Sequence, residues 1–162
     1  MRNLSFSLIL AGLIGVMSFG PGAIAQTSDE RLALKGYDPV AYFTEKRPML
    51  GDPQLRHEWD GAIYQFASAK NLELFKGEPD RYLPQYNNWC AATLAKGAKV
   101  HGNPEWWLVV DGRLYLFGGP AGPGLMKADA TAMKNQADEN WSKVSKLPAP
   151  PVPDYMRGVS VR

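Results

Sequence analysis

The chain has 162 residues, with 18 lysines and arginines against 16 aspartates and glutamates, and a single cysteine. Charges so close to balance, with no Lys/Arg cluster along the chain, exclude a nucleic-acid partner and an acidic lipid surface. One cysteine also excludes an intrachain disulfide. A chain of this length can still bury enough surface for one stable core, so we expect a single folded domain.

The first 25 residues have the layout of an export signal. A positive charge at Arg2 precedes an apolar run over 4–20, and small residues at Ala23 and Ala25 form a cleavage site before Gln26. The run contains serines and glycines and is shorter than the roughly 20 apolar residues of a spanning helix, so a retained membrane anchor is the weaker alternative. Cleavage near Ala25 predicts a periplasmic or secreted protein without stable membrane insertion, carrying 17 basic and 16 acidic side chains.

The folded domain is expected over 26–146. Its first part, 26–54, predicts irregular or half-helical structure, because prolines at 39, 48 and 53 exclude long regular elements. Two β-hairpins follow: apolar and aromatic runs at 55–59 and 62–66 flank Asp60-Gly61, and runs at 105–110 and 113–117 flank Asp111-Gly112. An Asp-Gly pair between two such runs is a strong signal for a two-residue hairpin turn.

Short helices are predicted between the hairpins. Ser68 caps a helix over 69–77, Pro79 opens a second one, and a third runs from Trp89 to Lys96 before Gly97. The glycine-rich segment 117–127 lacks the Gly-Lys-Ser/Thr ending of a phosphate loop and predicts a flexible connector.

A final helix is predicted from Leu125 to Val144, with an apolar stripe that includes Met133, Ala137 and Trp141. The proline-rich segment 147–162 predicts a flexible tail, with a docking peptide for a proline-recognising partner as the alternative. Together these elements indicate an α+β fold, in which two short hairpins form a small antiparallel sheet beside several short helices and one longer C-terminal helix.

Several segments resemble the exported YHS-domain family of bacteria. They are "ALKGYDPVAYF" (33–43), "WDGAIYQFASAKNLELFKGEPDRYLPQY" (59–86), "CA" (90–91), "DGRLYLF" (111–117) and "ADENW" (137–141). The resemblance implies a YHS-like scaffold. The short YHS modules hold zinc or copper with three cysteines, and the resemblance places Ala41, Ala67 and Asn71 at those positions, so this chain cannot bind a metal in the same way. The relatives also carry two glycines in place of Asn87 and Asn88.

Cys90 allows several interpretations. It could be a buried, small apolar residue on the inner face of a short helix, since free cysteines are among the most buried residues. It could be a copper or zinc ligand together with His57 or His101, or with a methionine such as Met49 or Met126, because thiolate, imidazole and thioether favour soft metals. It could be a catalytic nucleophile with a histidine base, or it could form an intermolecular disulfide.

Three aromatic residues in irregular segments suggest a ligand site. Tyr37, Tyr86 and Trp89 are predicted to line a shallow pocket with Asp38 and Cys90 at its edge. The sequence therefore favours an exported binding module for a soft metal ion, copper above all, or for a small ligand of the cell envelope. The alternatives are an envelope interaction or assembly factor without a metal, which contacts a protein partner, and a thiol-dependent enzyme that uses Cys90.

Overall fold

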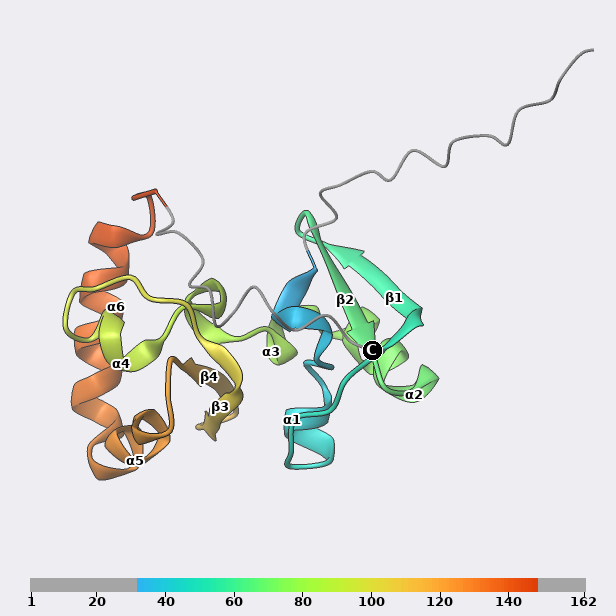
Figure 1. The fold of residues 1–162 in the computed structure, drawn as a ribbon, viewed down its shortest axis with the longest axis horizontal. Helices are drawn as coiled ribbons and strands as arrows, with labels where there is room; N and C mark the ends of the chain where they lie inside the picture. The colour runs from blue at the N-terminus through green and yellow to red at the C-terminus, as the bar shows by residue number, and fades with distance from the viewer. Residues whose placement is uncertain (1–31, 149–162) are drawn as a thin grey trace, which may run out of the picture.

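The computed structural model describes residues 32–148. The predicted export signal and most of the predicted tail, 149–162, lie outside these residues. The α+β class is confirmed (Figure 1). In chain order the elements are η1 (Ala33–Gly36), α1 (Ala41–Thr44), β1 (Asp52–Trp59), β2 (Ala62–Phe66), α2 (Ala69–Gly77), α3 (Pro79–Tyr82), η2 (Gln85–Asn88), α4 (Ala91–Leu94), β3 (Asn103–Val110), β4 (Arg113–Phe117), α5 (Ala121–Ala128) and α6 (Ala130–Val144).

Both predicted hairpins form, with the predicted turns. β1 pairs antiparallel with β2, and β3 pairs antiparallel with β4. Both residues of each turn have positive φ, 49° and 67° for Asp60-Gly61 and 49° and 71° for Asp111-Gly112. Two positive φ values define the turn type whose twist matches paired strands, and Asp-Gly is one of its preferred sequences.

The hairpins are two separate two-stranded sheets and do not join into one (Figure 1). Short segments of the chain cover the outer edge of one strand in each hairpin. Leu32 bridges to Ile63 on β2, while Pro84 and Cys90 bridge to Leu114 and Leu116 on β4. These segments occupy the edges of β2 and β4 that a neighbouring strand would need.

The chain contains an internal repeat that the sequence analysis did not detect. We define the first repeat as residues 32–82 and the second as residues 84–133. Each repeat runs in the same order, from a 3-10 turn through a short helix and a hairpin to a longer helix. The register of the two hairpins is also irregular at the same place, between residues 52 and 56 in β1 and between residues 103 and 107 in β3.

Backbone hydrogen bonds establish which residues are equivalent. Gly51 donates to the carbonyl of Gly36 at 2.8 Å, and Gly102 donates to the carbonyl of Asn88 at 2.8 Å. In the same way, the amide of Asp38 donates to Met49 and the amide of Cys90 donates to Val100, both at 2.8 Å. Asp38 and Cys90 therefore occupy equivalent positions of the two repeats.

The turn before each of these residues is left-handed. Its three residues have φ values of 51°, 52° and 81° at Leu34, Lys35 and Gly36, and of 61°, 49° and 68° at Tyr86, Asn87 and Asn88. Asparagine tolerates this backbone region better than most residues other than glycine. The resemblance places two glycines at positions 87 and 88, and positive φ at both is a physical reason for glycine there.

The helices were predicted in part. α2 has the predicted Ser68 cap, whose hydroxyl accepts a hydrogen bond from the Asn71 amide at 3.1 Å, and α3 begins at the predicted Pro79. The third helix is shorter than predicted, because Trp89 and Cys90 are extended and α4 covers only Ala91–Leu94.

The prediction of one final helix from 125 to 144 was wrong, as was the prediction of a connector over 117–127. α5 begins at Ala121, since its prolines lie at the N-cap and in the first turn, where helices need no intrahelical amide donors. α5 then ends at Asp129, whose side chain accepts from the Ala132 amide at 2.9 Å and so begins α6. Leu125 is 48% exposed and does not share the buried stripe of Ala137.

The repeats pack against each other through a shared apolar cluster. Leu34 and Tyr42 come from the first repeat, and Leu114 and Leu116 come from the second. The hydroxyl of the fully buried Tyr42 donates to the carbonyl of Pro104 at 2.9 Å, which links the two repeats. Within the described part of the chain, none of the helices combines the length and the apolar character needed to cross a bilayer.

Candidate functional site

Asp38 is fully buried, and its carboxylate already has four hydrogen-bond donors. One oxygen accepts from the amides of Val40 and Ala41 at 2.8 and 3.3 Å. The other accepts from the Ala67 amide at 2.8 Å and from the Asn71 side chain at 2.7 Å. We call this arrangement the Asp38 network. It ties α1, the end of β2 and α2 together, so Asp38 is a structural residue and does not lie at the edge of an open pocket.

The Asp38 network lies where the YHS resemblance places a metal site. The three positions at which the short modules carry cysteines are 41, 67 and 71, and all three donate to the same carboxylate. Positions 41 and 67 donate through their backbone amides, and position 71 donates through its side chain. In this chain all three donors are therefore taken by Asp38 itself.

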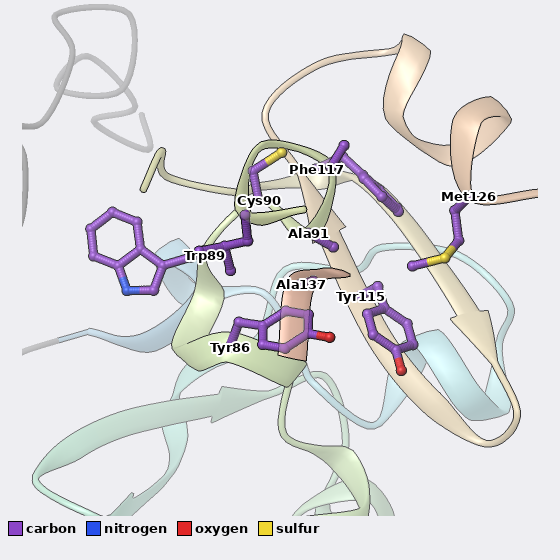
Figure 2. Packing of buried hydrophobic residues seen from close by; sticks show 10 residues of the cluster. Tyr86, Trp89, Cys90, Ala91, Tyr115, Phe117, Met126 and Ala137 are labelled. Atoms are coloured by element: carbon purple, nitrogen blue, oxygen red, sulfur yellow. The ribbon is translucent and has the colours of Figure 1, made fainter. Parts of the chain in front are cut away.

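Cys90, the equivalent residue of the second repeat, is also buried, with 2% of its surface exposed. Its amide donates to Val100, but within residues 32–148 its sulfur has no hydrogen-bond partner. Figure 2 shows the sulfur beside Phe117, with Met126 on the other side of the ring in this view. The predicted burial of Cys90 is confirmed, but its predicted place on the inner face of a helix is wrong, because Cys90 is the extended residue before α4.

A surface groove of about 370 Å³ reaches Cys90, and we call it the Cys90 groove. Its walls are formed by α4, Val100, the end of β4 and the start of α5. Most of its side chains are apolar or absent, and they include three glycines, Gly118, Gly119 and Gly122. The exposed Lys96 and the half-exposed Leu125 complete it.

The glycines explain why this space is open in the second repeat and filled in the first. Gly118 and Gly122 lie 51 residues after Ala67 and Asn71, in the same places relative to their hairpins. A Cβ atom on Gly118 would lie 3.8 Å from the Cys90 sulfur. Gly122 has no side chain that could reach residue 90 as Asn71 reaches Asp38, and a Cβ atom there would approach the Phe117 side chain to 2.4 Å.

The five predicted pocket residues do not form one pocket. The hydroxyl of Tyr37 donates to Glu105 at 3.1 Å, and that of Tyr86 donates to Asp138 at 2.8 Å. Burial, together with these bonds to carboxylates, raises the pKa of both tyrosines above the ordinary value. Of the predicted residues, only Cys90 lines the Cys90 groove.

Trp89 packs against His101 and Lys99 and does not line the Cys90 groove. Its ring lies 4.3 Å from the ring of His101, and the Lys99 ammonium lies 4.8 Å above it. Lys99 also donates to the carbonyls of Ser145 and Leu147, so Trp89 belongs to the packing around the end of α6.

The two predicted histidine ligands lie in different repeats, and only His101 is on a segment next to Cys90, since it follows Val100, whose carbonyl accepts from the Cys90 amide. His57 lies on β1 of the first repeat, with its ring 6.3 Å from that of Phe75, while His101 lies against Trp89. Among residues 32–148, no three His, Cys, Asp or Glu side chains are grouped so that they could hold a metal ion. Met49 belongs to the first repeat, far along the chain from Cys90, and Met126 packs in the core beyond Phe117 (Figure 2).

The sequence contained a signal for the repeat and hence for the groove. Gly51 and Gly102, Asp60 and Asp111, and Phe66 and Phe117 are each 51 residues apart. Aligning the two halves at this spacing places Gly118 and Gly122 opposite Ala67 and Asn71, which indicates a loss of side chains around residue 90.

No family model, no curated protein and no solved structure matches the chain.

Proposed function

We propose that the chain is an exported YHS-type binding module, and that its ligand is a small, largely apolar molecule with one anionic group, bound in the Cys90 groove. The observation that carries the proposal is the contrast between equivalent places of the two repeats. The Asp38 network fills this place in the first repeat, whereas the second repeat has a groove of about 370 Å³ that reaches a buried thiol. Pockets for small molecules typically measure roughly 300–1,000 Å³.

The chemistry of the groove supports this ligand class. Val100 and Leu125 offer apolar surface, and transfer of apolar groups from water to such surface is favourable. Lys96 is the one charged residue of the lining, so a negative group at one end of the ligand would gain an ion pair at its rim. The glycines allow the ligand to approach the backbone closely.

Copper stays a second candidate because the Cys90 thiol faces the groove without a hydrogen-bond partner in the described chain. The residues present do not fit a dedicated copper or zinc site, since no second soft ligand lines the groove. Cu(I) competition on the mature chain and on Cys90→Ser tests this candidate. Stoichiometric Cu(I) that is lost in the variant would favour copper over the apolar ligand.

The direct test uses anilinonaphthalene sulfonate, a fluorescent probe that is apolar and carries one negative charge. We expect saturable binding to the mature chain, and loss of most of that binding in Leu125→Asp, which puts a negative charge at the groove. Leu74→Asp is the matched control, because Leu74 is the exposed leucine at the equivalent place of the first repeat. Near-ultraviolet circular dichroism verifies that both variants remain folded.

Two results would overturn the proposal. One is the absence of saturable probe binding to a folded mature chain. The other is an equal loss of binding in Leu125→Asp and Leu74→Asp, which would mean that the probe does not recognise the groove.

A further inference from the structure

A second cavity lies on the second repeat, away from the Cys90 groove. It measures about 350 Å³ and is formed by the turn end of β3 and β4 together with α6. We call it the Arg113 pocket, after one of its lining residues; the others used below are Asp111, Tyr115, Lys134 and Asp138. It shares no lining residue with the Cys90 groove, so the inference does not depend on the proposed function.

Tyr115 gives this pocket an accessible hydroxyl that has no hydrogen-bond partner among the described residues, on a ring that is otherwise buried. The residue is 3% exposed, and within residues 32–148 its hydroxyl makes no hydrogen bond. Figure 2 shows the hydroxyl directed away from Phe117 and Met126, at the end of the ring that leaves the apolar cluster. Burial raises the pKa of this phenol, so the group is a hydrogen-bond donor at neutral pH.

The pocket has two basic and two acidic residues, and one of each sign has no oppositely charged partner among the described residues. Asp111 is paired with Lys134, and Asp138 accepts from the Tyr86 hydroxyl at 2.8 Å. The Arg113 guanidinium donates to the neutral amide oxygen of Gln85 at 3.1 Å and forms no ion pair with a described residue. Arginine presents a planar set of donors that matches the two oxygens of a carboxylate or phosphate.

A smaller cavity lies at the equivalent place beside the hairpin of the first repeat, and residues of both repeats line it. That cavity measures about 160 Å³ and is lined by Asp60, Ala62, Tyr64 and Leu83, among others. Each of these residues precedes its equivalent, Asp111, Arg113, Tyr115 or Lys134, by 51 positions. The turn aspartate and the tyrosine occur in both cavities, whereas the two basic residues occur only in the second.

We propose that the Arg113 pocket binds an oxyanion, the carboxylate or phosphate group of a small molecule, through the Arg113 guanidinium and the Tyr115 hydroxyl. The oxyanion would accept a hydrogen bond from the Tyr115 hydroxyl and pair with the Arg113 guanidinium at the same time. A charge-assisted hydrogen bond is stronger than a neutral one, so the arginine and the tyrosine should both matter for affinity.

The test is an NMR titration of the full mature chain with inorganic phosphate in one arm and benzoate in the other. We expect saturable shifts of the Tyr115 ring and the Arg113 side chain with at least one of the two anions; the arm that saturates identifies the source of the oxyanion. Arg113→Ala, which installs the residue of the first repeat, and Tyr115→Phe should each weaken binding about tenfold or more. Arg81→Ala, on an exposed arginine of the first repeat, and Leu125→Asp, in the Cys90 groove, should leave it unchanged.

The proposal fails if neither anion gives saturable shifts. It also fails if Arg113→Ala, with a native spectrum elsewhere, binds as the unchanged protein does. Leu125→Asp changes the Cys90 groove and not the Arg113 pocket. Its effect on the binding of anilinonaphthalene sulfonate therefore tests the proposed function separately from these results.

Discussion

The two repeats share a backbone arrangement but differ in what fills its centre. In the first repeat a carboxylate takes four donors from three segments, and the interior is closed. In the second repeat a cysteine stands at the equivalent position, glycines replace two of the residues that faced the carboxylate, and a groove remains.

On the proposed function, one scaffold serves for stability in one copy and for binding in the other. A buried carboxylate must be satisfied by donors, and once satisfied it fixes the elements that carry them. A thiol makes no such demand, because it behaves as a small hydrophobic group, so the elements around it can separate and leave space.

The largest effect is expected from Asp38→Ala. The substitution leaves three buried amides and the Asn71 side chain without their acceptor, and unsatisfied buried donors are costly. We expect a loss of about 4 kcal/mol in the free energy of unfolding, measured by urea denaturation. Asp52→Ala is the control, because Asp52 is exposed and accepts one bond from Gln54. A loss below about 1 kcal/mol would contradict a structural role for the Asp38 network.

The next largest effect is a difference in stability between alanine substitutions at two glycines of α5. Gly122→Ala places a Cβ atom 2.4 Å from the Phe117 side chain and should destabilise the fold by about 2 kcal/mol. Gly124→Ala meets no atom within 4 Å and should stabilise the helix by about 0.5 to 1 kcal/mol. Thermal unfolding of both variants measures the difference. Equal effects would mean that α5 does not pack closely on Phe117.

The hairpins were predictable because their information is local. An Asp-Gly turn needs only its own two residues and the runs on either side, and the Ser68 cap needs only the amide three residues later. The break between α5 and α6 is also local, but the apolar spacing from Leu125 to Met133 continued across Asp129 and hid it. The two-sheet arrangement depends on segments that bridge to distant strand edges, which no short window of the sequence contains.

The candidate site was harder to predict for a different reason. Tyr37, Tyr86 and Trp89 stand near the motif residues in the sequence, but their partners are Glu105, Asp138 and His101, which are at least 12 and as many as 68 positions away. A pocket depends on which side chains are missing as much as on those present. The Cys90 groove exists because glycines stand where the first repeat has larger residues, and only the repeat makes that absence visible.

An intermediate effect concerns alkaline pH. Burial raises the pKa of Tyr42, in the contact between the repeats, and of Tyr86, in the second repeat, above their ordinary value. A group whose folded pKa is raised contributes stability below its unfolded pKa and loses it as the pH rises. The free energy of unfolding should therefore fall as the pH increases beyond about 10.

Tyr42→Phe and Tyr86→Phe should each make this decline shallower, because each removes one group that ionises only on unfolding. Urea denaturation between about pH 8 and pH 11 measures the slope. Unchanged slopes in both variants would contradict the burial of these hydroxyls.

The smallest effect is expected at the helix caps. There the sign of the change in stability distinguishes two separate helices from one continuous helix. Asp129 lies between α5 and α6 of the second repeat, as Glu78 lies between α2 and α3 of the first. If Asp129 caps α6, Asp129→Ala should destabilise the protein by about 1 kcal/mol, as should Ser68→Ala at α2. If the sequence prediction of one continuous helix were right, Asp129 would be an interior residue, and alanine, the better helix former, would stabilise the protein by about 0.5 kcal/mol. Thr131→Ala, on the exposed face of the first turn of α6, controls for the change in helix propensity, so the difference between the two variants isolates the cap.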